Sequence, residues 1–303
     1  MITRKITELK FHSFLKLLKF PSFCISCERF LNKNTVTKTS RADFRMSPNV
    51  FRQKKVYDAT VQDVFSASSS TKILRLLVKE DGFSFKAGQW VDFYVPGIAE
   101  VTGYSMTSPP NEAKENGILE LSIKYGTFPP TYWVHTKCSG GEEVQIRVGG
   151  DFYYDPFCNQ TEAEANLLLV GGGVGINPLV SILYEYSDML MANTITNPGK
   201  VHLLYSAKTE EELIFKESFT NMEKEHPSLL CRYFVTGQLE TKQSPGITYS
   251  RITKDDVIQS IRKLQAEKTL CYVCGPSNMT DEVASWLHEL GIDKEHIRYE
   301  KWW

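Results

Sequence analysis

Four glycines within five positions constrain this chain more than any other feature. The apolar run Leu167–Val170 leads directly into Gly171-Gly-Gly-Val-Gly175, and apolar residues at helical spacing resume at Leu179. This order predicts a buried parallel strand, a glycine turn and a helix. Glycines let a ligand approach the backbone closely, and the first N–H groups of the helix attract an anion. The stretch therefore suits a dinucleotide pyrophosphate; the alternative is a turn that only links strand to helix.

The chain around this turn alternates between strand and helix patterns. The predicted strands are Leu167–Val170, Lys200–Tyr205, Leu229–Thr236, Thr269–Val273 and His296–Glu300. The predicted helices are Asn177–Met191, Glu210–Lys224, Thr253–Leu264 and Ser277–Leu290. This alternation predicts a doubly wound, five-stranded parallel sheet. Ligands bind such sheets at the carboxyl ends of the strands, and a second motif, Cys274-Gly275-Pro276 with Met279 behind it, also follows a strand.

The preceding part of the chain, from Lys54 to Asp155, has short alternating runs separated by turn residues. The runs that predict strands are Val56–Val61, Lys72–Val78, Gln89–Val95, Ile118–Lys124 and Glu143–Val148. Their regular spacing is typical of a β-barrel or sandwich, and Pro130–Lys137 has the spacing of one or two helical turns. We therefore predict a leader over residues 1–46, a β-domain over 50–160 and an α/β domain over 161–303.

The first 46 residues differ in charge from the rest. They hold ten Lys/Arg and three acidic residues, which leaves 25 basic and 33 acidic residues in the body. A basic amphipathic head predicts a mitochondrial transit peptide, with a surface or membrane-lying helix as the alternative; lysines interrupt its apolar stretch too early for a secretory signal. The acidic body argues against a nucleic-acid partner, and no later segment is apolar for long enough to span a membrane.

The seven cysteines do not form a recognisable framework. Their scattered spacing predicts no disulfide set, no iron–sulfur cluster and no metal site. Cys271-Tyr-Val-Cys274 is formally a CxxC pair, but it lies across the end of an apolar strand. A thioredoxin-like motif would lie at the start of a helix, so we do not expect one here.

Several motifs together resemble one family. A GGGxGxxP turn, a distal CGPxxM, a C-terminal Glu-Lys-Trp-Trp and an all-β domain in front are similar to the ferredoxin reductase-like flavoproteins, which include cytochrome b5 reductases. The similarity covers roughly Lys54 to Trp303. It implies a six-stranded antiparallel barrel that holds a flavin, FAD or FMN, and a second domain that binds the pyridine nucleotide. Hydride would pass from nicotinamide to flavin, and electrons would then pass to an acceptor.

The flavin signature of that family, Arg-x-Tyr-Ser-x-x-Ser, is matched by Thr102-Gly-Tyr104-Ser105-Met-Thr-Ser108 except at its arginine. By resemblance, Tyr104 lies against the flavin ring, Ser105 offers its hydroxyl near the reactive nitrogen and Ser108 closes the turn. Without the resemblance, they are a strand-edge aromatic and turn serines. Thr102 cannot reproduce the bidentate phosphate contact of an arginine, although Lys124 and a helix starting near Thr131 could supply part of it.

The resemblance also implies catalytic roles for Ser105, Cys274 and Glu300, which would lie near the nicotinamide. Cys274 can equally be a small buried residue at a strand end. One of the terminal residues Trp302 and Trp303 could cover the flavin ring, or the pair could be a docked hydrophobic tail. The expected cofactor-binding residues are Tyr104, Ser105, Met106, Thr107, Ser108, Lys124, Thr131, Gly171, Gly172, Gly173, Val174, Gly175, Ile176, Asn177, Pro178, Cys274, Gly275, Pro276 and Met279.

The expected cofactors are NAD and a flavin. Glu210–Glu212 would repel the 2′-phosphate of NADP, and the end of the strand Leu229–Thr236 lacks the serine and arginine of NADP-dependent members, so NAD is favoured over NADP. The sequence thus predicts a mitochondrial NADH-dependent flavin oxidoreductase. Its rival is a non-catalytic nucleotide-binding module that holds flavin weakly or not at all and acts as a sensor or an assembly partner, which Thr102 favours. A third hypothesis is a reductase subunit that delivers electrons to another protein.

Overall fold

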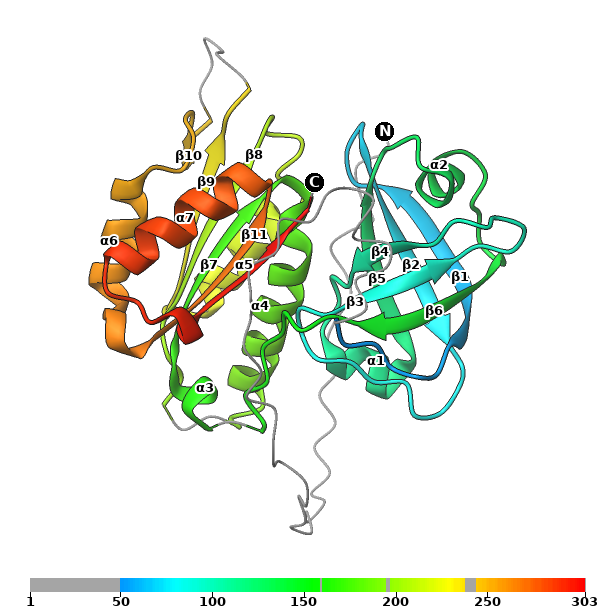
Figure 1. Ribbon diagram of the computed structural model, residues 1–303, viewed down its shortest axis with the longest axis horizontal. Coiled ribbons are helices and arrows are strands. Elements are labelled where there is room, and N and C mark those ends of the chain that lie inside the picture. The colour runs from blue at the N-terminus through cyan, green and yellow to red at the C-terminus, as the bar shows by residue number, and fades with distance from the viewer. Residues whose placement is uncertain (1–49, 159, 195–196, 238–243, 303) are drawn as a thin grey trace. The chain divides into compact units, whose positions relative to one another are not determined.

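The computed structural model describes residues 50–158, 160–194, 197–237 and 244–302 (Figure 1). The predicted transit segment, residues 1–46, lies outside these ranges, as does Trp303. Within the described part of the chain, no helix is long and apolar enough to cross a membrane.

The first sheet is a six-stranded antiparallel barrel. Its strands are β1 (Tyr57–Ser66), β2 (Thr71–Val78), β3 (Trp90–Tyr94), β4 (Thr102–Ser105), β5 (Ile118–Lys124) and β6 (Glu143–Gly149), and two helices, α1 (Pro110–Asn116) and α2 (Pro129–Thr136), accompany them. The strand order is β4-β3-β6-β1-β2-β5, and a bridge between Met106 and Leu121 joins the two edges. Alternate residues, such as Leu119, Leu121 and Ile123 of β5, fill the core.

The second sheet is parallel, as predicted. Its strands are β7 (Asn166–Gly172), β8 (Val201–Ala207), β9 (Leu229–Val235), β10 (Ile247–Thr248), β11 (Thr269–Gly275) and β12 (Ile297–Lys301). The order β10-β9-β8-β7-β11-β12 reverses between β7 and β11. The glycine turn and Cys274-Gly275-Pro276 therefore flank the switch point, where α/β sheets bind their ligands.

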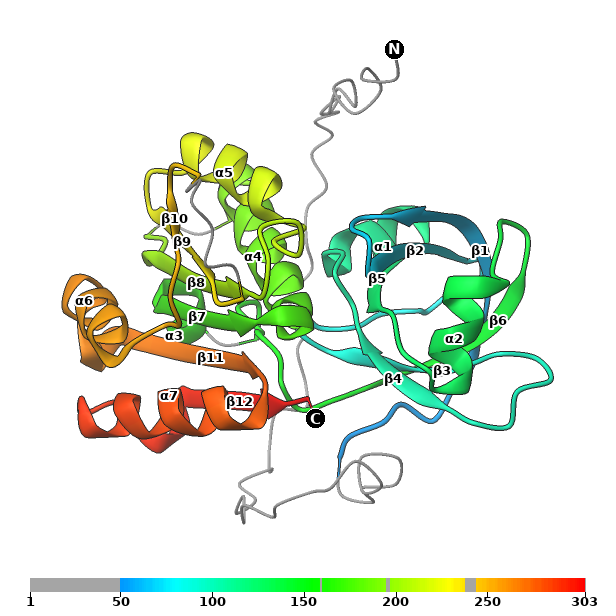
Figure 2. The same cartoon turned by 90° about the horizontal axis from the view of Figure 1, so that it is seen from above.

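Helices cover both faces of this parallel sheet (Figure 2). They are α4 (Ile176–Met191), α5 (Lys216–Glu225), α6 (Lys254–Leu264) and α7 (Ser277–Glu289), with the short α3 (Gln160–Glu164) before β7. Leu167 and Leu169 of β7 pack toward the face of α4 and α5, while Leu168 and Val170 pack toward α6 and α7. All four side chains are fully buried, because a central parallel strand is covered on both sides.

The predicted elements differ from the structure at three places. The four-residue β4 is a sixth barrel strand that periodicity did not reveal, and the two-residue β10 makes the parallel sheet six-stranded instead of five-stranded. The helix predicted from Glu210 begins only at Lys216. The glutamates Glu210, Glu211 and Glu212 lie in a turn, where each carboxylate has a partner outside any helix.

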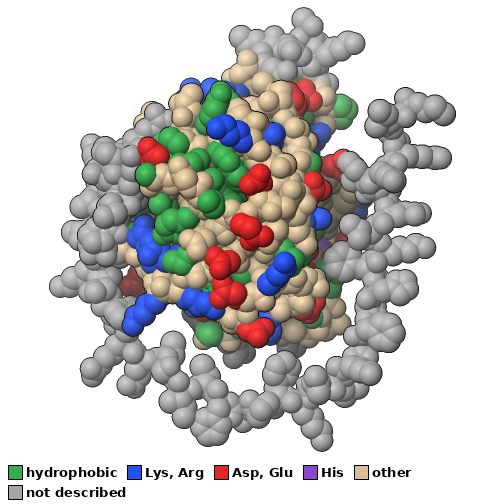
Figure 3. All heavy atoms as spheres, turned by 90° about the vertical axis from the view of Figure 1, so that its right-hand side faces the viewer, with side chains coloured by type: hydrophobic (Ala, Val, Ile, Leu, Met, Phe, Trp, Pro, Cys, Tyr) green, Lys and Arg blue, Asp and Glu red, His purple; other side chains and the backbone are tan. Residues whose placement is uncertain are grey.

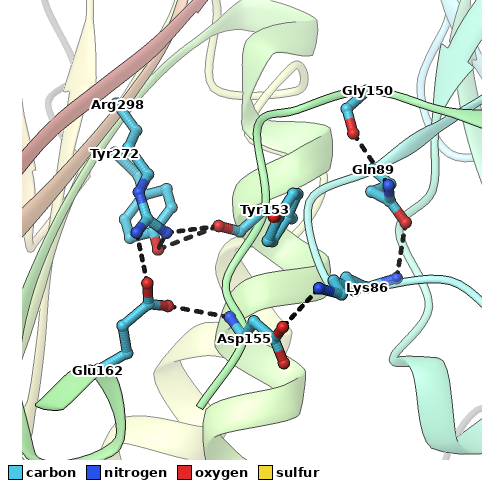
Figure 4. A network of polar contacts seen from close by, with 8 residues as sticks. All are labelled: Lys86, Gln89, Gly150, Tyr153, Asp155, Glu162, Tyr272 and Arg298. Atoms are coloured by element: carbon cyan, nitrogen blue, oxygen red, sulfur yellow. Dashed lines mark hydrogen bonds and ion pairs between the residues drawn. The ribbon is translucent and has the colours of Figure 1, made fainter. Parts of the chain in front are cut away.

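Polar contacts fix the connection between the two sheets (Figure 4). Arg298 of β12 donates to the carbonyl of Tyr153 at 2.7 Å and pairs with Glu162. Lys86, from the loop before β3, pairs with Asp155 at 2.5 Å. Both cations also lie against aromatic rings, Arg298 over Tyr272 and Lys86 over Tyr153. The connection is therefore tied to the barrel and to the last strands of the parallel sheet.

Candidate nucleotide-binding site

The glycine turn is built to receive an anion. Gly173–Gly175 form a single 3₁₀ turn, and α4 follows from Ile176 with no side-chain cap and no acidic residue in its first turn. The N-terminal N–H groups of a helix lack intrahelical partners, and the dipole of a 16-residue helix is positive there. Gly173 has φ of 57°, and an added Cβ there would meet nothing within 4 Å. The turn is therefore open on the side where a pyrophosphate would bind.

The other glycines of the turn are needed for close packing. A Cβ on Gly175 would lie 2.4 Å from the carbonyl oxygen of Cys274, and one on Gly172 would lie 2.7 Å from the sulfur of Met279. Both distances are far below van der Waals contact. The two sequence motifs, after β7 and after β11, therefore touch each other at the switch point.

Cys274, Glu300 and Trp302 lie together beside this point. Cys274 is opposite Glu300 in the β11–β12 pair, and the Trp302 indole donates to Glu300 Oε2 at 3.1 Å. The Trp302 backbone donates to the Gly275 carbonyl at 3.2 Å. Burial raises the pKa of Glu300 to about 8 despite the Trp302 hydrogen bond, and burial also raises the pKa of Cys274 well above its ordinary value. At neutral pH both groups are therefore uncharged, which suits a neutral dihydronicotinamide ring.

The start of α4 also bonds to the barrel. Asn177 Nδ2 donates to the Ser122 carbonyl at 2.7 Å, and Ser181, one turn later, donates to the Ser108 carbonyl at 2.8 Å. Thr107 Oγ1, Ser122 Oγ and Asn177 Oδ1 are buried here without a hydrogen-bond partner among the described residues. Because an unpaired buried polar atom costs about 1–3 kcal/mol, these oxygens suit a ligand group that both donates and accepts, such as a carboxamide, or a bound water.

The residues of the flavin signature are largely enclosed. Tyr104 is 8% exposed, its ring packs edge-on against Phe93 at 5.5 Å between centroids, and its hydroxyl lies 2.8 Å from Thr131 Oγ1. Ser105, Met106, Thr107 and Ser108 are buried as well. Tyr104, the residue predicted to lie against the flavin ring, is therefore almost fully enclosed.

The residues predicted to bind a flavin phosphate offer few donors. Thr102 is neutral, and α2 begins with Pro129 and Pro130, which have no N–H to donate. The N–H of Tyr132 already donates to the Phe128 carbonyl, which leaves the N–H of Thr131 as a donor within the first turn of α2. A hollow of about 250 Å³ beside α2 is lined mainly by apolar and aromatic side chains, and its one lysine, Lys137, lies at the far end of the helix.

Lys124, the other predicted phosphate ligand, is engaged elsewhere. Its ammonium pairs with Glu212 at 2.5 Å, and Glu212 also accepts from Ser70 at 3.2 Å. A flavin phosphate requires charge-assisted donors, but Thr102 is neutral, two prolines reduce the N–H groups at the start of α2, and Lys124 is paired with Glu212. Among the described residues, the positions predicted for the flavin phosphate are therefore poorer in available donors than the start of α4.

The surface of the barrel also carries exposed apolar side chains. Phe65, Tyr125 and Tyr132 are each at least 40% exposed. Figure 3 shows hydrophobic side chains gathered between charged ones on the side of the molecule that lies to the right in Figure 1.

Sequence reasoning missed Ser122 and Ser181 at this site, and it did not foresee that Glu212 pairs with Lys124. Ser181 could have been found, because it is four residues after Asn177 and so lies on the same face of α4. The prolines that remove helix donors were also visible in the sequence. The partner of Lys124 was not, since Glu212 lies 88 residues away.

Comparison with known proteins supports the nucleotide-binding half most directly. The family model described as oxidoreductase NAD-binding domain matches residues 169–285. The curated Oxidoreductase NAD-binding domain-containing protein 1 of Danio rerio is 41% identical over 276 residues, covering 88% of this chain and 100% of that protein. The Homo sapiens protein of the same name is 40% identical over 289 residues, covering 92% and 91%.

Solved structures share the fold at low identity. The CS-b5R domains of human Ncb5or in the NAD⁺ form align with a TM-score of 0.67 at 19% identity, covering 84% of this chain and 71% of that one. A ferredoxin NADP⁺ reductase from Neisseria gonorrhoeae with bound FAD and NADP aligns with a TM-score of 0.65 at 18% identity, covering 82% and 99%. Both place the chain in the two-domain ferredoxin reductase-like fold.

Proposed function

Because this chain belongs to the oxidoreductase NAD-binding domain-containing protein 1 family, we propose that it binds NAD(H) at the switch point of its parallel sheet and holds no flavin as a resident cofactor. The proposal rests on a difference in available hydrogen-bond donors between the N-termini of α4 and α2. The N-terminus of α4 is uncapped and open at Gly173, whereas α2 begins with two prolines and Lys124 is paired with Glu212.

In this proposal, the N–H groups of Val174, Gly175 and the first turn of α4 bind the pyrophosphate. The nicotinamide lies toward Cys274 and Glu300, where Trp302 holds the Glu300 carboxyl in place. Asn177, Ser122 and Thr107 offer hydrogen-bonding groups to its carboxamide. The protein would then respond to NAD(H) as a sensor or an assembly partner.

The test is a visible spectrum of the full chain, purified without added flavin, followed by incubation with FAD or FMN, gel filtration and titration with NADH. We expect no flavin absorbance at either stage, together with saturable quenching of tryptophan fluorescence by NADH. Stoichiometric flavin that survives gel filtration would overturn the proposal.

The second candidate function is the NADH-dependent oxidoreductase predicted from the sequence. The observation that favours it is the uncharged pair of Cys274 and Glu300 at the carboxyl ends of β11 and β12. Bleaching of a bound flavin by NADH under argon, faster than by NADPH, would establish this candidate. Its electron acceptor would be a separate molecule, such as another protein.

We also propose that the protein is mitochondrial, on the basis of the basic amphipathic head. Residues 1–46 fused to a fluorescent protein should direct it to mitochondria. A diffuse cytosolic signal would contradict this assignment.

A further inference from the structure

The three consecutive glutamates after β8 have different partners. Glu211 accepts from the backbone N–H and the hydroxyl of Ser69, at 2.5 and 3.1 Å. Glu212 pairs with Lys124, also on the barrel. Glu210 instead accepts from the hydroxyl of Tyr249, the residue that follows β10. Among the described residues, Glu210 is therefore the one of the three that bonds to the edge of the parallel sheet formed by β9 and β10.

This edge is where the adenosine half of a nucleotide would lie. With the pyrophosphate at the end of β7, the two halves extend in opposite directions along the carboxyl edge. One half reaches β11 and β12, and the other crosses the ends of β8 and β9, which lie about 5 and 10 Å from β7 at normal strand spacing. Cys274 and Glu300 mark the first direction as the nicotinamide side. The second direction leads past Glu210.

The geometry of the loop holds Glu210 in place there. Tyr249 itself accepts from the Ser244 backbone at 2.7 Å, and Gly237 at the end of β9 donates to the Lys208 carbonyl at 2.8 Å, which ties the two strand ends together. The Tyr249 and Ser244 hydrogen bonds also keep the pKa of Glu210 below its ordinary value, so the carboxylate is charged at neutral pH.

Two lysines in this part of the chain, Lys216 and Lys208, carry a charge opposite to that of the Glu210 carboxylate. Lys216 lowers the pKa of Glu210 and packs over the Tyr233 ring, while Lys208 is exposed on the same loop. Lys208 would lose rotamer freedom in reaching a phosphate, whereas Glu210 is already held. Thr236 and Gly237, at the end of β9, add no positive charge.

We propose that Glu210, held by Tyr249, is the residue that selects NAD(H) over NADP(H). Its carboxylate accepts hydrogen bonds from the ribose hydroxyls of NAD(H), as an acidic residue does in many dinucleotide sites, and repels the 2′-phosphate of NADP(H). This inference rests on the proposed nucleotide binding and assigns its specificity to one residue.

The test compares NADH and NADPH binding to the full-length protein and three variants by fluorescence titration. Glu210→Gln keeps the shape and removes the charge, and we expect it to tighten NADPH binding by about tenfold while NADH binding changes by less than about threefold. Tyr249→Phe releases the carboxylate and should shift the ratio in the same direction by a smaller factor. Glu211→Gln is the matched control, and it should leave the ratio unchanged because its partner is Ser69.

Titrations with 5′-AMP and 2′,5′-ADP place the effect on the adenosine half, since these ligands differ only by the 2′-phosphate. Glu210→Gln should improve 2′,5′-ADP binding by the same factor as NADPH binding. An unchanged NADH to NADPH ratio in Glu210→Gln, or an equal shift in Glu211→Gln, would overturn the inference while leaving nucleotide binding intact. Failure of the wild-type protein to bind either dinucleotide would overturn the proposed function as well.

Discussion

Two helix N-termini in this molecule lie at the positions predicted to bind the pyridine nucleotide and the flavin phosphate, and they differ in chemistry. At α4 the first turn has no side-chain cap and no acidic residue, and Gly173 leaves the approach open. At α2 the first two residues are prolines, and the nearest lysine on β5 is paired with Glu212. The same element of secondary structure thus attracts an anion in one place and offers it little in the other, because side chains and N–H groups decide the field at a helix end.

The largest effect is expected from breaking the α4 side. In Gly175→Ala the new Cβ would meet the Cys274 carbonyl at 2.4 Å, so the turn and β11 must separate. We expect NADH affinity to fall at least about 30-fold in a fluorescence titration. Gly173→Ala is the matched control: its Cβ has room and only the left-handed φ of 57° opposes it, so a smaller loss is expected. Equal losses in the two variants would contradict the packing argument.

The substitution Thr102→Arg should add a phosphate donor on the α2 side. A guanidinium at this half-buried position of β4 would supply the missing bidentate donor, and we expect FAD and FMN affinity to rise by about tenfold in equilibrium dialysis. Thr102→Gln controls for side-chain length without charge and should change affinity little. If the arginine variant binds flavin no better than wild type, phosphate donors are not what limits this end of the barrel.

The buried carboxyl of Glu300, on the proposed nicotinamide side, should make the stability of the protein depend on pH. The folded-state pKa of Glu300 is raised to about 8, so the folded protein holds a proton that the unfolded chain releases near its ordinary pKa. Stability from this group is therefore present at low pH and is lost as pH rises toward 8. Between pH 5.5 and 8.5, we expect the Tm of wild type to fall by several °C relative to Glu300→Gln.

The control for this pH effect is Glu295→Gln, because Glu295 is exposed in the turn before β12. Its Tm should follow that of wild type across the same pH range in scanning calorimetry. Parallel curves for Glu300→Gln and wild type would mean that Glu300 is ionised in the folded protein.

The smallest effect is expected from Glu212→Gln. The Lys124–Glu212 pair is partly exposed, so its loss should cost less than about 1 kcal/mol of unfolding free energy, and added salt should reduce the difference in urea titrations. The variant also frees Lys124, so flavin affinity should rise, by less than in Thr102→Arg. A larger gain than in Thr102→Arg would make Lys124, and not the missing arginine, the decisive donor.

The sequence predicted the α4 side well because local signals agreed there. A continuous apolar strand, four glycines and an apolar helix each pointed to the same turn, and the structure has that order. Strand β4 was not predicted from periodicity, because Thr102–Ser105 is only four residues long and contains a glycine. The late start of α5 was not predicted because glutamates favour helices locally. Contacts with Ser69, Lys124 and Tyr249, which are distant in the sequence, instead hold these glutamates in a turn.

The most direct test of the contrast between the two helix ends is a pair of titrations on one preparation of the full-length protein. NADH and FAD are titrated separately by calorimetry under the same buffer conditions. We expect NADH to bind at least about tenfold more tightly than FAD. FAD binding that is tighter than NADH binding, at one flavin per chain, would contradict it.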